Sequence, residues 1–113
     1  MYYLKVLDLL EEIYASVEQV NFVSEVVTHV EGPTLKVRLI IESGFIQVFF
    51  NANTHALAFA LIKDNKRVFG VDRDNIRNWH IHPTEDPTQH IPCEEMGFED
   101  FLQEVKKIIE RET

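Results

Sequence analysis

The fold is decided by residues 35–50, LKVRLIIESGFIQVFF, which read as two strands joined by a tight turn. The first half alternates: Leu35, Val37, Leu39 and Ile41 face one way, and Lys36, Arg38 and Glu42 face the other. The pair Ser43-Gly44 is a compact hairpin signal. The second half, from Phe45 to Phe50, is apolar on both faces apart from Gln47, which is typical of a central strand. The segment therefore predicts an antiparallel pair inside a larger sheet.

Further strands are expected on both sides of this pair. Residues 22–30 are rich in β-branched side chains and run into the turn Glu31-Gly32-Pro33. Downstream, strands are expected at 55–63, at 67–72 and at 79–82, with a turn over 73–78. Three prolines and many polar residues predict an irregular loop from Pro83 to Glu95. The close spacing of the turns predicts an antiparallel meander of five or six strands.

Amphipathic helices are predicted at both ends of the chain. From Tyr3 to Glu18 the apolar residues recur at helical spacing. Near the C-terminus a second stripe consists of Phe98, Phe101, Leu102, Val105, Ile108 and Ile109. Acidic residues open this second segment and basic residues follow, as the helix dipole favours. Two helices and a meander predict a single α+β domain that spans residues 1–113.

Composition restricts the classes of function. A chain of 113 residues with 45% hydrophobic residues can form one core without disulfides. The N-terminus has no signal-peptide pattern, and the longest apolar run, Ala56 to Ile62, is too short to span a bilayer. We therefore expect a soluble, cytoplasmic protein with no membrane partner. The net charge of −8 disfavours broad nucleic-acid binding, although it leaves room for a small RNA site with a few arginines.

The strands that are apolar on both faces raise the question of what covers the sheet. The two helices can cover one face, whereas the segments 45–50 and 57–62 would still expose large side chains on the other. Either one helix lies on each face or the chain pairs with copies of itself. The sequence favours a homo-oligomer, and a dimer in the first place.

The densest group of reactive side chains is the segment 78–83, NWHIHP, with His90 and Cys93 shortly after it. Because side chains alternate along a strand, His80 and His82 share one face, while their apolar neighbours face the other. Adjacent imidazoles can act as an acid and a base, or can bind a metal through neutral nitrogens. Any chemistry is therefore expected here.

Two motifs, RVFGVDRD at 67–74 and WHIHP at 79–83, resemble the TumE-like proteins, which are toxin components of bacterial and archaeal toxin–antitoxin pairs. The resemblance covers roughly the last two thirds of the chain. In that family an aromatic-x-x-Asp segment ends a hairpin strand, a His-containing segment follows, and an amphipathic helix closes the domain. Phe69 to Asp72 and His80 to His82 occupy the matching places. The resemblance implies a toxin that acts on or near RNA and an antitoxin protein that masks its surface.

As a metal-independent ribonuclease, the protein needs a base, an acid and a cation that stabilises the phosphorane. The candidate catalytic set is His80, His82 and Arg73, with Arg67 and Arg77 as alternative cations.

As a metal site, the same region offers His80, His82 and His90, with Cys93 or Asp72 as a fourth ligand for a divalent metal such as zinc. The interval of seven residues followed by H-x-x-C fits no strong structural-zinc pattern. From spacing alone we expect no bound cofactor and at most weak zinc binding.

Two other interpretations stay open. The histidines can be structural and tie the loop after Pro83 to the sheet by hydrogen bonds. The chain lacks a Gly-rich phosphate loop, a nucleophile elbow and a CxxC pair, so a non-catalytic dimeric binding module is the second candidate function, ahead of a metal-binding protein.

Overall fold

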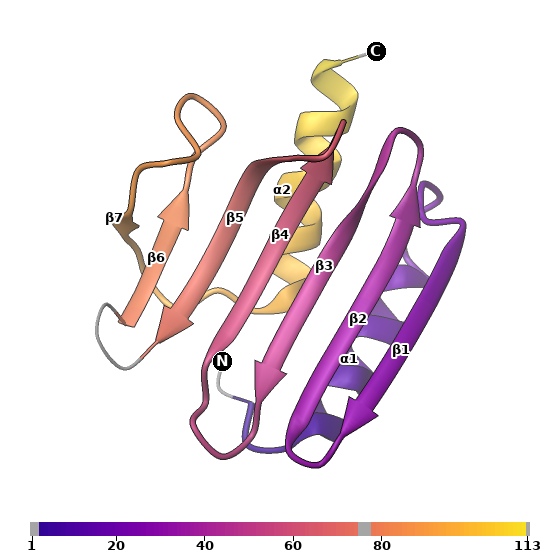
Figure 1. The fold of residues 1–113 in the computed structure, drawn as a ribbon. Coiled ribbons are helices and arrows are strands. Elements are labelled where there is room, and N and C mark those ends of the chain that lie inside the picture. The colour runs from indigo at the N-terminus through magenta and orange to yellow at the C-terminus, as the bar shows by residue number, and fades with distance from the viewer. Residues whose placement is uncertain (1–2, 75–77, 113) are drawn as a thin grey trace.

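The computed structural model describes residues 3–74 and 78–112, and within them one antiparallel sheet is backed by two helices. The strands are β1 (Glu25–Glu31), β2 (Thr34–Ile41), β3 (Gly44–Asn51), β4 (Leu57–Lys63), β5 (Lys66–Asp74), β6 (Asn78–His82) and β7 (Ile91–Pro92), and the helices are α1 (Val6–Val17) and α2 (Phe98–Arg111). The strands lie side by side in chain order (Figure 1). The predicted α+β meander is confirmed, with seven described strands in place of five or six.

The additional strand, β7, is the main departure from the sequence prediction. It lies inside the segment that was expected to be an irregular loop. It pairs with β6 through His80 opposite Pro92 and Ile81 opposite Ile91. A two-residue strand that contains a proline leaves no composition signal, and only an edge position tolerates the missing N–H of proline.

Smaller differences concern where elements begin and end. Helix α1 begins at Val6, so Tyr3 precedes the helix that was expected to include it. Strand β5 continues to Asp74 into the turn expected at 73–78, and residues 75–77 of that turn lie outside the described residues.

Two tight connections show how local chemistry sets the register. Asp64 and Asn65 link β4 to β5 with φ of 52° and 64°, a left-handed pair that suits a two-residue hairpin and that Asp and Asn tolerate. Gly44 begins β3 where the strands approach closely, since a Cβ there would lie 2.0 Å from the carbonyl oxygen of Ile62.

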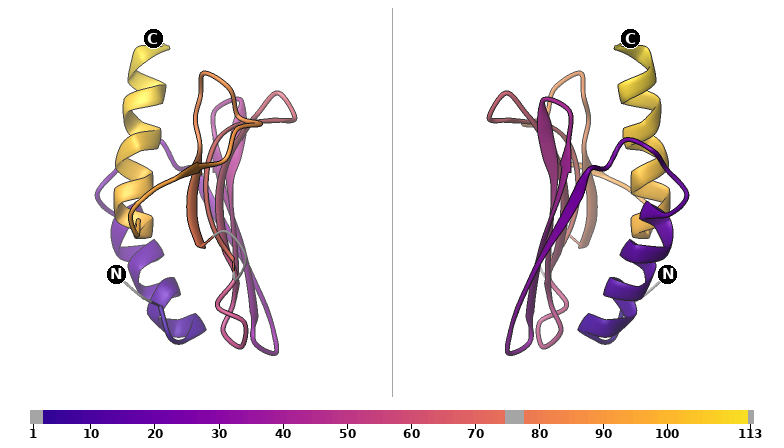
Figure 2. Two further views of the ribbon diagram at one scale, coloured as in Figure 1. Left: turned by 90° about the vertical axis from the view of Figure 1, so that its left-hand side faces the viewer. Right: turned by 90° about the vertical axis from the view of Figure 1, so that its right-hand side faces the viewer.

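The hydrophobic core lies between the sheet and the two helices, which cover the same face (Figure 2). Leu9 and Ile13 of α1 are fully buried against it. From α2, the rings of Phe98 and Phe101 lie 5.5 Å and 5.4 Å from the ring of Phe59 in β4. The alternation predicted for residues 35–41 is confirmed, because its apolar row faces this core.

A hydrogen-bonded link joins the N-terminal segment to the start of α2. The Tyr3 hydroxyl donates to Glu12 Oε2 over 2.7 Å and accepts from the Phe98 N–H over 2.8 Å. Glu12 Oε2 also accepts from the Glu99 N–H over 2.9 Å. This hydrogen bond satisfies one of the free N–H groups in the first turn of α2, where the N-cap residue Gly97 has no side chain that could do so. Burial raises the pKa of the Tyr3 hydroxyl well above its ordinary value, so the group stays a donor.

The other face of the sheet, called here the open face, carries no helix (Figure 2). On β2, β3 and β4 it presents Lys36, Arg38, Ile40, Phe45, Gln47, Phe49, Ala58, Ala60 and Ile62. The guanidinium carbon of Arg38 lies 4.1 Å from the centre of the Phe45 ring. Among the described helices, neither is long and apolar enough to cross a membrane.

Candidate functional site

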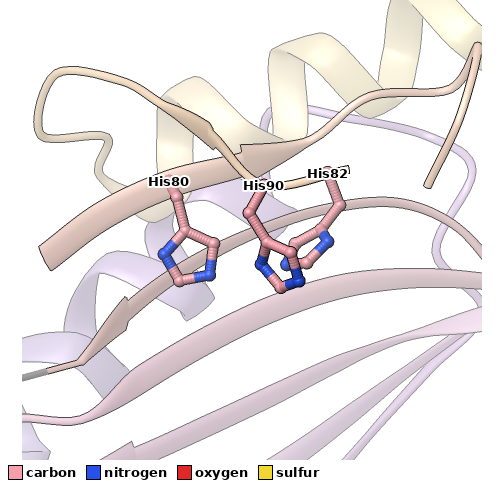
Figure 3. Close-up of side chains that lie close together, drawn as sticks. All are labelled: His80, His82 and His90. Atoms are coloured by element: carbon pink, nitrogen blue, oxygen red, sulfur yellow. The ribbon is translucent and has the colours of Figure 1, made fainter. Parts of the chain in front are cut away.

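Three histidines come together on the open face at the edge formed by β6 and β7. Strand alternation places His80 and His82 on the same side, as predicted, and both are almost fully buried. Strand β7 pairs with β6 in antiparallel fashion, with Ile81 opposite Ile91. The next position in this register brings His90 beside His82. Figure 3 shows the three rings converging. One ring nitrogen of each histidine lies within 4.8 Å of one from each of the others, a grouping that can hold a metal ion.

His82 meets the rings of His80 and His90 edge to face, whereas His80 and His90 are tilted at 48° to each other. The ring centres of His80 and His82 are 5.2 Å apart, and His90 lies 5.2 Å from the first and 4.5 Å from the second. His90 is exposed, whereas the other two lie beneath it. A ligand that approaches from solvent therefore meets His90 first.

The carboxylate of Asp72 lies beside the imidazoles. Asp72 is on β5, directly opposite His80 in the register. Its Oδ2 lies 3.0 Å from His82 Nε2 and 3.6 Å from His80 Nε2. Its Oδ1 accepts a hydrogen bond of 2.6 Å from an Arg67 NH2 group. We call His80, His82, His90, Asp72 and Arg67 the histidine cluster.

Arg67 reaches this position because Gly70 has no side chain. A Cβ on Gly70 would lie 2.2 Å from the Arg67 guanidinium, so the arginine lies across the glycine on the open face. A register shift between Leu61 and Ile62 of β4 accompanies this crossing. Arg67 Nε is buried and has no hydrogen-bond partner within the described residues. The cluster therefore contains a buried donor that is unsatisfied within the described residues.

The protons on the two buried histidines follow from their partners. His80 Nδ1 lies 3.2 Å from the Asn78 carbonyl oxygen, and His82 Nδ1 lies 3.0 Å from the Pro87 carbonyl oxygen. A carbonyl only accepts, so both Nδ1 atoms carry a proton. His82 Nε2 also faces a carboxylate oxygen of Asp72. In a neutral ring this Nε2 is an acceptor, as is the carboxylate oxygen opposite it.

The remaining predicted residues lie apart from the cluster. Arg73 is adjacent to Asp72 on β5, so it faces the opposite side of the sheet, and it donates to the His55 carbonyl oxygen over 2.9 Å. Arg77 lies outside the described residues. Cys93 does not join the histidine group, and burial raises the pKa of its thiol, which disfavours the thiolate that a metal requires.

Sequence reasoning named the histidines and Asp72 and listed Arg67 only as an alternative cation. The missed element was Gly70, which lets the arginine reach the carboxylate. The sequence contains an indication of this arrangement, because Gly70 and Asp72 are two residues apart and share a face of the predicted strand. A glycine inside a strand often marks a place where another group approaches the backbone closely.

Two grooves lie elsewhere, at the end of the sheet near the C-terminus of α2. Their walls share Ser43, Lys63 and Glu112. Lys63 and Glu112 form an ion pair in this shared wall. We place the functional site at the histidine cluster, where an unsatisfied donor and converging imidazoles point to a ligand.

Comparison of the chain with protein-family models, with curated proteins and with solved structures gave no match.

Proposed function

We propose that this protein is a cytoplasmic toxin component of a toxin–antitoxin pair and acts on RNA at the histidine cluster. The observation that carries the proposal is the convergence of three imidazoles, a carboxylate and a guanidinium on one sheet face. Phosphodiester cleavage needs groups that transfer protons and a cation that holds the phosphate. The resemblance of residues 67–83 to TumE-like proteins supports the same reading. The cation that we assign to the phosphate is Arg67, because it contacts Asp72 and Arg73 does not face the cluster.

The open face carries cations beside aromatic rings, although the chain as a whole is acidic. On β2, β3 and β4 the described residues of this face include Lys36 and Arg38 and no acidic residue. The strand register places Glu25 and Glu31 of β1 and Asp72 of β5 on the same face, so the cations are confined to its centre. Phe45 and Phe49 lie among them, and a base can stack on an aromatic ring beside a cation. This surface continues across the sheet to Arg67, so single-stranded RNA can lie along it and reach the histidines.

The function is tested by expression in a bacterial host and by cleavage of a mixed RNA substrate with purified protein. The wild-type chain should arrest growth, and the double variant His80→Ala, His82→Ala should relieve the arrest. Loss of a group that transfers a proton lowers a rate by about 100-fold to 10,000-fold. Arg67→Gln should lower RNA cleavage to a similar extent while the histidines stay in place.

Folding is controlled by circular dichroism, and His29→Ala serves as the matched variant, because His29 is a largely exposed histidine on β1 at the far edge of the sheet. It should remain fully toxic. A folded double variant that is as toxic as the wild type would exclude the paired histidines as the active groups. A neighbouring gene for a small helix-turn-helix protein would identify the expected antitoxin.

A second candidate function, the dimeric binding module, is favoured by the uncovered apolar side chains of the open face. Ile40, Phe45, Phe49 and Ile62 are only partly buried there, and Val27 on β1 is 48% exposed. Burying one large apolar side chain stabilises by about 1.5 to 3 kcal/mol, so several together favour pairing of two copies through this face. This pairing belongs to the binding module alone, because a dimer through the open face would cover the surface that RNA needs in the first proposal.

Light scattering at micromolar concentration should therefore give the mass of a dimer. Phe49→Lys should give a monomer, because a charge on the paired face would be buried without a partner. The matched substitution Tyr14→Lys, on an exposed position of α1, should leave the dimer intact. A monomeric wild-type chain would contradict the proposed pairing.

A further inference from the structure

We infer that His80, His82 and His90 bind a divalent metal ion of the zinc class, with the Asp72 carboxylate beside it. The inference concerns the same cluster as the proposed function, but it does not depend on RNA cleavage. A ring nitrogen bound to zinc cannot transfer a proton, so the proton transfer proposed above belongs to the metal-free chain. It names an ion that the sequence spacing disfavoured and that the folded arrangement of the imidazoles favours.

The first argument is distance. Zinc–nitrogen bonds are about 2.0–2.1 Å long, so two nitrogens on one tetrahedral ion lie about 3.3 Å apart. The three ring nitrogens lie within 4.8 Å of one another. Closing the set requires a shift of about 1.5 Å at most. His90 is the exposed member of the set, whereas His80 and His82 are buried, so the shift falls on the side chain nearest to solvent.

The second argument is the orientation of the buried rings. A histidine that binds a metal usually donates its other ring N–H to a carbonyl or carboxylate, which fixes the tautomer. His80 and His82 both do so, through Nδ1 to the carbonyls of Asn78 and Pro87. The Nε2 atoms of both rings are then left facing the same oxygen, Asp72 Oδ2. These two ligands are pre-oriented before an ion arrives.

The third argument is charge. In a neutral ring His82 Nε2 is an acceptor, because Nδ1 carries the proton, and it lies 3.0 Å from a second acceptor, Asp72 Oδ2. A divalent ion bound by the three histidines would be attracted by this carboxylate beside it. Arg67 holds the other oxygen, Oδ1, and so keeps Oδ2 turned toward the imidazoles.

The third ligand is delivered by the chain after β6. The Thr88 N–H and hydroxyl both donate to Asp86 Oδ1, and the Gln89 N–H donates to the Asp86 carbonyl, which orders the turn just before His90. The antiparallel register of β6 and β7 then brings His90 to the pair on β6. A metal bound here would also fasten this turn to the sheet.

The experiment measures zinc binding directly. The purified chain is stripped with a chelator and titrated with zinc chloride by calorimetry, with elemental analysis of the dialysed protein. We expect one ion per chain and a rise of the melting temperature with added zinc, since a ligand that binds only the folded state stabilises it. His90→Ala should weaken binding by at least about 100-fold and abolish the zinc-dependent rise, while the chain stays folded because this histidine is exposed.

Two controls keep the ligand set specific. His29→Ala removes an exposed imidazole outside the cluster and should leave the affinity unchanged. Cys93→Ala should also leave it unchanged, whereas a loss would overturn the assignment of the ligands. Failure of the wild-type chain to take up zinc, or equal uptake by His90→Ala, would overturn the inference. Because zinc stoichiometry and not growth arrest is measured, such a failure is distinct from a failure of the proposed toxin function.

Discussion

Replacing Phe59 with alanine should lower the free energy of unfolding by about 3 to 5 kcal/mol, because a large aromatic side chain is removed from a packed core. Phe59 is fully buried in β4 and contacts two aromatic rings of α2, those of Phe98 and Phe101. The cavity would lie between sheet and helix, where the backbone of a central strand cannot collapse into it. Urea unfolding monitored by circular dichroism measures the loss.

The matched control is Phe49→Ala on the adjacent strand β3. Phe49 pairs with Ala58 and lies on the open face, where it is only partly buried. At protein concentrations low enough to disfavour a dimer, its loss should cost less than about half as much. Equal costs for the two variants would mean that the face opposite the helices is packed as tightly as the core.

Asp72→Ala should lower the free energy of unfolding of the metal-free protein by about 1 to 3 kcal/mol. The carboxylate accepts from Arg67, and its side chain is 20% exposed. A largely buried donor that loses its acceptor costs about this much, with some relief from solvent. Thermal and urea unfolding in the presence of a chelator measure this cost.

Asp72→Asn separates the hydrogen bonds of this residue from its charge. The amide oxygen can accept from Arg67, and the amide nitrogen can donate to His82 Nε2 when that ring is neutral. We therefore expect the asparagine variant to recover most of the stability while it binds zinc more weakly than the wild type. A variant with alanine that is as stable as the one with asparagine would show that these hydrogen bonds do not hold the cluster together.

The architecture was predictable because it depends on short-range periodicity. Residues 35–41 alternate, and the residues of α2 repeat at helical spacing, because in each element one set of side chains is buried away from water. The turn residues between the strands set the order of the meander. The shared face of His80 and His82 followed from the same rule, because it needs only the two-residue period of one strand.

The composition of the cluster depended on the tertiary structure. His90 lies in the cluster because of the register between β6 and β7, and Arg67 lies there because Gly70 leaves space for it. Arg73 faces the opposite side of the sheet, because it is one position away from Asp72 along the strand. Sequence spacing cannot show such meetings, since they arise from contacts between strands. The amino-acid sequence by itself determined the elements, their order and the pair of histidines. Only the folded sheet decided which third histidine, carboxylate and guanidinium surround that pair, because these distances are set by strand register and by a missing side chain.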